Sequence, residues 1–201
     1  MLNRNNFAIA KLAEKDVYGS LKNLRVEHDK TIVTDGRLLL VMTGDSIPQS
    51  DYPSIPGFAP MPEHKPISLA RETALAVAKA IPKDKSIPAL NHAVVGNNGN
   101  GDMAIATTDL SSAQTFKAID SGGSFPNYEL VIPAKGEATA IISFDPRLMV
   151  ALLQSMDSVY DNGGQHKVVL WIKDAESPML IECSANDQTA TGVLMPVKLE
   201  L

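Results

Sequence analysis

The sequence predicts an α+β protein built from repeated units, each with the order strand-helix-strand-strand-strand. This order is expected from about residue 65 to residue 119 and again from about residue 138 to residue 197. Short polar turns separate consecutive strands, which predicts antiparallel sheets. The first forty or so residues fit the same unit with a reduced helix. We therefore expect three units and two main helices.

Composition limits the classes of protein to which the chain can belong. Its 201 residues are enough for one large domain or two small ones. The net charge of −5 argues against a nonspecific nucleic-acid binder, because such proteins carry a surplus of Lys and Arg. Cys183 is the single cysteine, which excludes an intrachain disulfide. Without a secretion signal or a long apolar run, a cytoplasmic protein is expected.

The opening block is expected to consist mainly of strands. We predict a short strand at 7–10, one or two helical turns at 11–16, and strands at 21–27, 31–34 and 37–43. The last two strands are joined by Asp35-Gly36, a pair that tolerates the positive φ of a tight hairpin.

Residues 44–66 are rich in proline, with Pro48, Pro53, Pro56, Pro60, Pro62 and Pro66. Proline at this density cannot continue a helix or a central strand, so an extended loop or arm is expected. The sequence assigns this segment no chemistry.

Start and stop signals mark the two main helices. The first is expected at 69–81, with Ser68 as its N-cap and Pro82 as its stop. The second follows a strand expected at 138–144. Asp145 caps it and Pro146 takes its first position. Strands are expected at 89–95, 102–107 and 113–119 after the first helix, and at 167–173, 178–184 and 190–197 after the second.

A proline-bounded segment, Phe125–Pro133, separates two blocks of the chain. Its first three residues have turn chemistry, and a short apolar run follows until Pro133. We expect a short strand here that begins and ends abruptly.

Four short strings resemble the bacterial DNA sliding clamp, the processivity ring of the replicative polymerase. Residues 125–128 are similar to its phenylalanine-proline-aspartate-tyrosine stretch, and residues 33–39 to its threonine-aspartate-glycine-histidine-arginine-leucine string. Residues 177–181 resemble its serine-proline-valine run. Residues 193–199 resemble its methionine-proline-methionine-arginine-leucine terminus. The likeness covers the family's middle domain and the second half of its last domain, with no counterpart for the first.

The resemblance implies a DNA-clamp-like fold with a clamp-like domain at 1–124, an interdomain strand and linker at 125–136, and a clamp-like half-domain at 137–201. It also implies a hydrophobic groove that takes short peptides from polymerases and the clamp loader. The residues implied for this groove are Thr34, Gly36, Arg37, Leu38, Leu39, Pro126, Leu130, Val131, Val193, Met195, Pro196 and Val197.

A structural interpretation of the same strings remains open. Alternating Val, Leu and Met in a terminal strand is common in a plain core, and Asp-Gly is common in a hairpin turn. The chain also departs from the family: Leu130 stands where a basic residue is usual, Arg37-Leu38 replaces histidine-arginine, and Glu200-Leu201 extend past the usual end.

DNA contact is the weaker part of the resemblance. Clamps line their hole with Lys and Arg, and the candidates here are Arg71, Lys79, Arg147, Lys22 and Arg25. Each of them is also explained as a solvated surface cation.

No catalytic or metal site is expected. The four histidines, His28, His64, His92 and His166, have no ligand spacing, and no cofactor is implied. We therefore expect a non-enzymatic clamp-like protein that binds replication or repair partners, associates with or encircles double-stranded DNA, and forms a homo-oligomer. The alternative is a structural or regulatory oligomer that keeps the fold without peptide or DNA binding.

Overall fold

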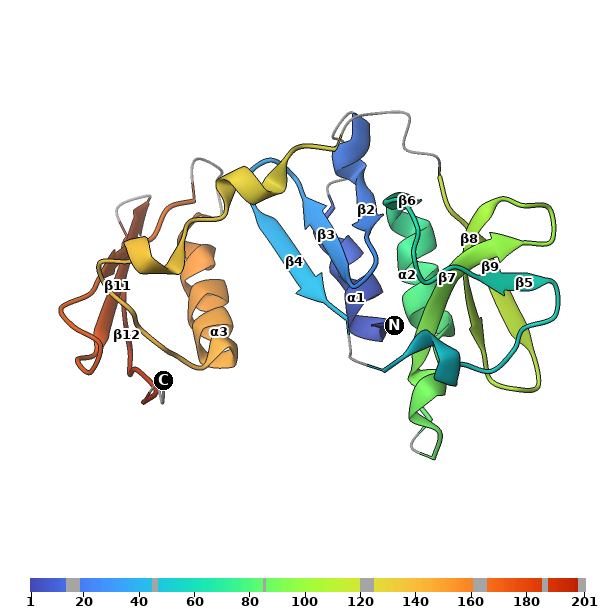
Figure 1. Ribbon diagram of the computed structural model, residues 1–201. Coiled ribbons are helices and arrows are strands. Elements are labelled where there is room, and N and C mark those ends of the chain that lie inside the picture. Colours follow the sequence, from blue (N-terminus) through green and yellow to red (C-terminus); the bar gives the residue numbers. More distant parts are fainter. Residues whose placement is uncertain are drawn as a thin grey trace. The chain divides into compact units, whose positions relative to one another are not determined.

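The computed structural model describes residues 1–13, 19–44, 47–84, 86–119, 125–160, 166–185 and 188–198. The chain divides into two compact units, Met1–Val131 and Ile132–Leu201 (Figure 1). Within the described ranges, no helix is long and apolar enough to cross a membrane.

Unit 1 contains two repeats of the expected order. The first repeat consists of β1 (Leu2–Asn3), α1 (Arg4–Ala8), β2 (Asn23–Val26), β3 (Lys30–Thr34) and β4 (Leu39–Thr43), with short 3-10 helices at Ile9–Leu12 and Gly19–Lys22. The second repeat consists of β6 (Ile67–Ala70), α2 (Arg71–Ala80), β7 (His92–Asn98), β8 (Met103–Thr108) and β9 (Ala113–Lys117), with a 3-10 helix at Pro88–Asn91. The repeated units of the predicted fold class are confirmed.

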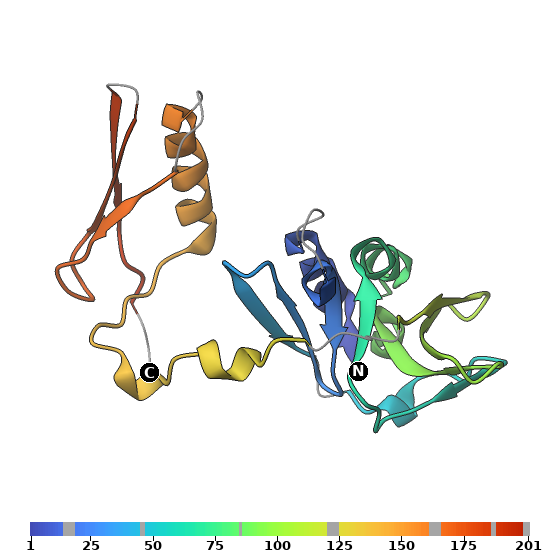
Figure 2. The same ribbon diagram turned by 90° about the horizontal axis from the view of Figure 1, so that it is seen from above.

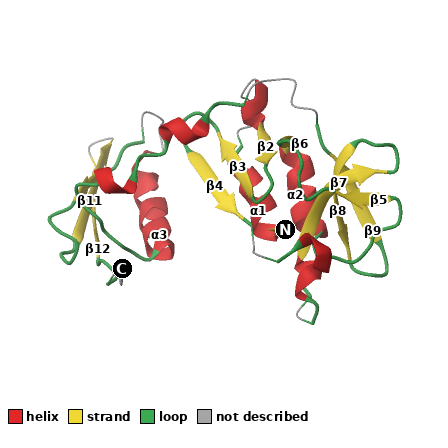
Figure 3. Ribbon diagram, in the orientation of Figure 1, coloured by secondary structure: helices red, strands yellow, loops and turns green. Residues whose placement is uncertain are grey.

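The two repeats exchange their first strands. β6 opens the second repeat but pairs with β2 of the first, giving the sheet order β4-β3-β2-β6. β1 opens the first repeat but pairs with β7 of the second, giving β1-β7-β8-β9. All pairings are antiparallel (Figure 3). Neither repeat therefore has a complete sheet without the other.

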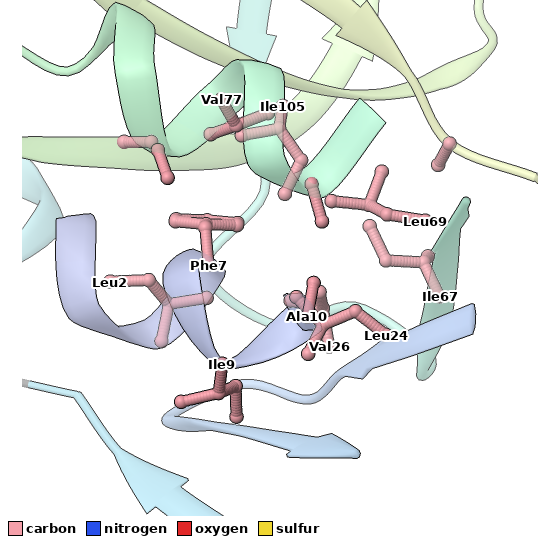
Figure 4. Close-up of a cluster of buried hydrophobic side chains, with 14 of the residues drawn as sticks. Leu2, Phe7, Ile9, Ala10, Leu24, Val26, Ile67, Leu69, Val77 and Ile105 are labelled. Atoms are coloured by element: carbon pink, nitrogen blue, oxygen red, sulfur yellow. The ribbon is translucent and has the colours of Figure 1, made fainter. Parts of the chain in front are cut away.

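The core of unit 1 lies where the two helices meet the two sheets. α1 and α2 lie side by side (Figures 1 and 2). Phe7 from α1, Val77 from α2 and Leu24 from β2 are fully buried in one cluster (Figure 4). The Arg4 guanidinium donates to the Ile81 carbonyl, which satisfies an acceptor just past the end of α2.

The proline-rich segment is only partly the loop that was expected. It contains a 3-10 helix, Gln49–Asp51, and a strand, β5 (Phe58–Pro60), which pairs with β7. Tyr52, Ile55 and Phe58 are buried against the sheet. β5 approaches closely because Gly96 has no side chain: a Cβ there would lie 2.2 Å from the Ala59 carbonyl oxygen. The prediction missed the packing that holds this segment down.

Unit 2 contains the third repeat. Its helix is α3 (Pro146–Asp157), followed by a 3-10 helix at Ser158–Tyr160, and its strands are β10 (Val169–Trp171), β11 (Met179–Ala185) and β12 (Gln188–Leu194), in the order β10-β11-β12. Another 3-10 helix spans Lys135–Glu137. Met149 and Met156 pack against Ile181 in a small core. The predicted cap is confirmed, since the Asp145 side chain accepts from the Arg147 amide.

Two predictions near the N-termini of helices were wrong. Residues 7–10 are helical because Asn3 and Asn6 form a capping box that starts a helix at Arg4. Residues 14–16 of the expected helical turns lie outside the described residues. Ser68 is not an N-cap, because it lies within β6 opposite Arg25; Ala70 takes the cap position with no side-chain hydrogen bond.

Two predicted strands are also absent from the described residues. Tyr128–Val131 forms a 3-10 helix, since Tyr128 turns inward while the following side chains stay exposed. Residues 138–144 form no strand; the Ala138 amide donates to the Lys135 carbonyl at 3.3 Å, and the Ser143 carbonyl accepts from the Val197 amide at 2.8 Å. Local propensity favoured a strand in both segments, but neither has a neighbouring strand along its length.

Candidate functional site

The β3–β4 hairpin presents the first group of candidate residues. The Thr34 hydroxyl donates to the Leu38 carbonyl at 2.6 Å and accepts from the Gly36 amide at 3.1 Å. Asp35 Oδ1 accepts from the amides of Arg37 and Leu38, both at 2.8 Å. These backbone amides lower the pKa of Asp35. Gly36 has φ +88°, which favours glycine. Thr34 is thus buried inside the loop, and Leu38 is exposed at its end.

The β8–β9 hairpin repeats this geometry. The Thr108 hydroxyl donates to the Ser112 carbonyl at 2.7 Å and accepts from the Leu110 amide at 3.0 Å. Asp109 Oδ1 accepts from the amides of Ser111 and Ser112. The Thr-Asp string therefore builds a hairpin in both repeats and does not by itself mark a binding site. The position of Leu38 differs, because Ser112 occupies it in the second hairpin.

The second group of candidates lies on the outer side of β3 and β4. Phe125 and Tyr128 are buried against Ile32. The Arg25 guanidinium lies over the Phe125 ring, 5.2 Å from its centroid. With the two aromatic side chains turned inward, Pro126, Leu130 and Val131 remain exposed; Leu130 is 82% exposed.

Glu27 holds this segment in place. Its carboxylate accepts from Arg25 Nε at 2.7 Å and from the Tyr128 hydroxyl at 3.1 Å, and Lys30 Nζ lies 3.5 Å away. Burial raises the pKa of Glu27, but these hydrogen bonds and cations outweigh burial and leave the pKa below its ordinary value. Residues 125–131 are therefore anchored by an ionised carboxylate.

The third group belongs to unit 2. Along Val193–Val197 the side chains alternate: Leu194 is buried in the core, whereas Val193, Met195 and Val197 are exposed. Met195 is 61% exposed. Pro196 is half-buried. A plain core does not explain these exposed residues. Glu200-Leu201, the departure at the end of the chain, lies outside the described residues.

The cations proposed to contact DNA have different surroundings. Lys22 and Lys79 are exposed. Arg71 forms an ion pair with Glu72 at 3.6 Å, and its buried Nε has no hydrogen-bond partner among the described residues. Arg25 is held by Glu27 and Phe125. In unit 2, Arg147 forms an ion pair with Asp145 at 3.1 Å.

Solved structures with the same architecture come from bacterial replication proteins. A putative DNA polymerase III beta subunit from Eubacterium rectale matches 97% of this chain and 49% of its own, with a TM-score of 0.58 at 10% identity. The DNA polymerase sliding clamp of Pseudomonas aeruginosa, solved with a ligand, matches 98% of this chain and 64% of its own, with a TM-score of 0.52 at 18% identity. The chain has the fold of the DNA sliding clamps.

Other comparisons define the extent of this likeness. The beta clamp of Helicobacter pylori, in complex with 3,4-difluorobenzamide, has a TM-score of 0.50 at 14% identity and matches 98% of this chain and 64% of its own. The chain thus spans about half to two thirds of the length of these clamps. No protein-family model and no curated protein sequence matches it.

The described part of this clamp fold contains no cluster of three or more His, Cys, Asp or Glu residues that would hold a metal ion. His92 is buried, and its Nδ1 lies 3.0 Å from the Pro88 carbonyl oxygen. His166 stacks on Tyr160 and lies 2.6 Å from Asp157. These histidines make contacts within the fold.

Sequence reasoning missed two cations on the helical surface of unit 1. Arg4 lies at the start of α1, and Lys11 is exposed in the 3-10 helix that follows it. They were missed because residues 7–10 were expected to form a strand. The Asn3-x-x-Asn6 capping pattern is the signal that indicates a helix here.

Proposed function

We propose that the chain is a non-enzymatic, sliding-clamp-like protein that binds short peptides of replication or repair proteins. One observation carries the proposal: at the positions implied by the family resemblance, six large apolar side chains are exposed. They are Leu38, Leu130 and Val131 on unit 1, and Val193, Met195 and Val197 on unit 2.

The chemistry of these residues suits an extended peptide. Burying one Leu, Val or Met side chain contributes about 1.5–3 kcal/mol, so a few anchors reach micromolar affinity after the cost of association. Methionine adapts to different anchor shapes, which suits a surface with several partners. The exposed Leu130, in place of the family's usual basic residue, favours an apolar side chain in the peptide.

A peptide titration tests this proposal on each unit separately. A fluorescent clamp-binding peptide from a bacterial DNA polymerase is titrated with the wild type, Leu130→Asp and Met195→Asp, and its anisotropy is measured. Each substitution places a charge on a proposed contact and is expected to weaken binding by about tenfold or more, equal to about 1.4 kcal/mol.

Leu110→Asp is the matched control. Leu110 is also an exposed leucine, but it lies in the β8–β9 hairpin, which carries none of the proposed contacts. Its affinity is expected to equal that of the wild type. Equal affinity of all four proteins, or no saturable binding, would remove the peptide-binding function.

Association with double-stranded DNA is a second part of the proposal. The supporting cations are Lys79 and Arg71 on α2, Lys22 and Arg25 near the start of β2, and Arg147 on α3, joined by Arg4 and Lys11. Several of these are paired with carboxylates, and the net charge is −5, so weak binding that falls steeply with salt is expected. Anisotropy of a labelled duplex at several salt concentrations measures it. An affinity independent of salt would contradict ionic contact with phosphates.

A structural or regulatory oligomer is the alternative function. It is favoured by the exposed apolar edge strand β10. An oligomer that binds neither the peptide nor the duplex would establish this alternative in place of the peptide-binding function.

A further inference from the structure

The third repeat has a sheet edge that is closed in both other repeats. In unit 1, the edges of β2 and β7 are covered by β6 and β1, the first strands of the opposite repeats. Among the described residues, β10 pairs with β11 and with no other strand. The equivalent edge of unit 2 is therefore uncovered.

The core side of β10 is exposed at this edge. Leu170 lies opposite the fully buried Ile181, so both side chains face α3. Val168 faces the same side, yet Val168 is 42% exposed and Leu170 is 46% exposed. Leu24 and Val26, the equivalent residues of β2, are both 0% exposed. The small core of unit 2 is thus open where a strand covers it in unit 1.

Residues 140–144 have the matching free side. The Val197 amide donates to the Ser143 carbonyl at 2.8 Å, as the Ile119 amide donates to Ser68 of β6 at 2.7 Å. Ser143 and Ser68 both lie two residues before the N-cap of a helix. β6 uses its other side to pair with β2. The segment around Ser143 therefore holds the position of a first strand, with one side paired to its own repeat.

The helix of the third repeat also has an unpaired face. In unit 1, α1 and α2 contact each other, and Phe7 and Val77 are buried between the sheets. On α3, Leu148 and Val150 are exposed. Both are large aliphatic residues on opposite sides of the buried Met149, so a neighbouring helix would cover one of them.

We propose that a second copy of this chain completes the third repeat. The two copies exchange residues 140–144 reciprocally: the segment of each copy pairs antiparallel with β10 of the other, and the two α3 helices meet. A single repeat contains both the free edge and the segment that fits it, so a two-fold pair satisfies both at once. The two copies would form one complete clamp domain from their third repeats, independently of peptide binding.

The register follows from the repeats of unit 1. In unit 1, the N-cap residue of each helix pairs with the first residue of a strand in the other repeat. Asn3, the N-cap of α1, pairs with His92 of β7, and Ala70, the N-cap of α2, pairs with Asn23 of β2. Extending the β7–β8 and β2–β3 registers by two residues places His92 opposite Thr108 of β8 and Asn23 opposite Thr34 of β3.

In the third repeat, Ser184 corresponds to those two threonines, since each begins a hairpin; Ser184 pairs with Thr189. Continuing the β10–β11 register by two residues places Lys167 opposite Ser184. Asp145, the N-cap of α3, then lies opposite Lys167 of the partner subunit. This opposite-charge pair occurs twice in the dimer and favours a second copy as the occupant. The same register pairs Phe144 and Ile142 with the partner's Val168 and Leu170, so apolar residues cover the open core.

Light scattering on the purified chain, together with an edge variant, tests the proposal. The wild type is expected to be a dimer at micromolar concentration, and Leu170→Lys is expected to weaken the dimer by about tenfold or more, because it places a charge in the completed core. Leu110→Lys, an exposed leucine in unit 1, is expected to leave the dimer intact. A monomeric wild type overturns the proposal.

A cross-link between copies tests the register without disturbing the core. Ser143 and the partner's Val169 lie opposite each other in this register, at a Cα separation of about 4.5–5.5 Å that suits a disulfide. Within one chain, Ser143 contacts the segment after β12, so β10 lies three strand spacings away from it, about 14 Å.

The double variant Ser143→Cys/Val169→Cys is therefore expected to give covalent dimers on mild oxidation, and mass spectrometry should find residue 143 joined to residue 169. Ser143→Cys/Trp171→Cys, shifted by two residues on the same face, is the control and is expected to cross-link poorly. If the wild type is a dimer but Ser143→Cys/Val169→Cys forms no such cross-link, the proposed exchange is overturned.

Discussion

The Tyr128 hydroxyl donates a hydrogen bond of 3.1 Å to Glu27 Oε2 and so joins the segment after unit 1's last strand to the end of β2. Tyr128 is buried, whereas Leu130, two residues later, is almost fully exposed. The anchor thus fixes the backbone from which the proposed peptide contacts project.

Tyr128→Phe removes this anchor while keeping the ring. Glu27 would lose one neutral donor but keep Arg25, so unit 1 is expected to lose about 1–2 kcal/mol of unfolding free energy. Urea denaturation measures the loss. The peptide affinity should fall as well, because residues 125–131 are held less firmly. An unchanged denaturation midpoint would show that the hydrogen bond does not stabilise the fold.

Acid should weaken the same anchor. The folded pKa of Glu27 lies below its ordinary value of about 4.3, so its contribution to stability is present above that value and is lost as the pH falls through the folded pKa. Thermal unfolding of the wild type between pH 7 and pH 3 is compared with that of Glu27→Gln, which cannot titrate at this position. The wild type should lose more stability than the variant as the pH falls. Parallel curves would assign the acid sensitivity to other groups.

Removing a glycine from the β3–β4 hairpin and adding one to the β8–β9 hairpin should have opposite effects on stability. Gly36 and Leu110 hold equivalent positions, with φ +88° and φ +72°. Gly36→Ala should cost about 1 kcal/mol, whereas Leu110→Gly should be neutral or stabilise the fold by up to about 1 kcal/mol, because a leucine in the left-handed region is strained. Denaturant unfolding of both variants measures this. A stabilised Gly36→Ala would contradict the shared geometry.

Gly96→Ala should detach β5 from the sheet. The new Cβ would meet the Ala59 carbonyl at 2.2 Å, which is too close for any real contact. Proteolysis is expected to cut within residues 47–62 much faster in this variant than in the wild type. Gly136→Ala is the control, because a Cβ at Gly136 would lie in open space. Gly57→Ala is unsuitable as a control, because Gly57 has φ +72° and a side chain there would be strained. Equal cleavage of all proteins would show that β5 does not depend on this contact.

The parts of the fold that local chemistry determines could be predicted. The Asp35-Gly36 turn and the Asp145-Pro146 helix start depend on adjacent residues, and both appear where expected. The exchange of β1 and β6 depends on pairs far apart in sequence, such as Asn3 with His92, and no local pattern reveals them. Ser68 shows the consequence, because a residue with good capping chemistry is held inside a strand.

For the candidate site, the sequence indicated positions, and their role in peptide binding stays a prediction. The strings around Leu38, Leu130 and Met195 indicated positions whose side chains are exposed. The sequence did not reveal that Arg25 is engaged by Glu27, since that pairing depends on the local geometry after β2. The odd number of repeats predicts one unpaired sheet edge, but it did not identify β10 as that edge, because an apolar strand has the same pattern whether or not a neighbour covers it.

Photo-cross-linking with a clamp-binding peptide tests the proposed function most directly. The peptide carries a benzophenone in place of one apolar anchor, and the cross-linked residues are mapped by mass spectrometry. The proposal predicts saturable labelling within residues 34–39 and 126–131 of unit 1 and within residues 193–197 of unit 2, suppressed by excess unlabelled peptide. Labelling that is confined to other parts of the chain, or that unlabelled peptide does not suppress, would contradict it.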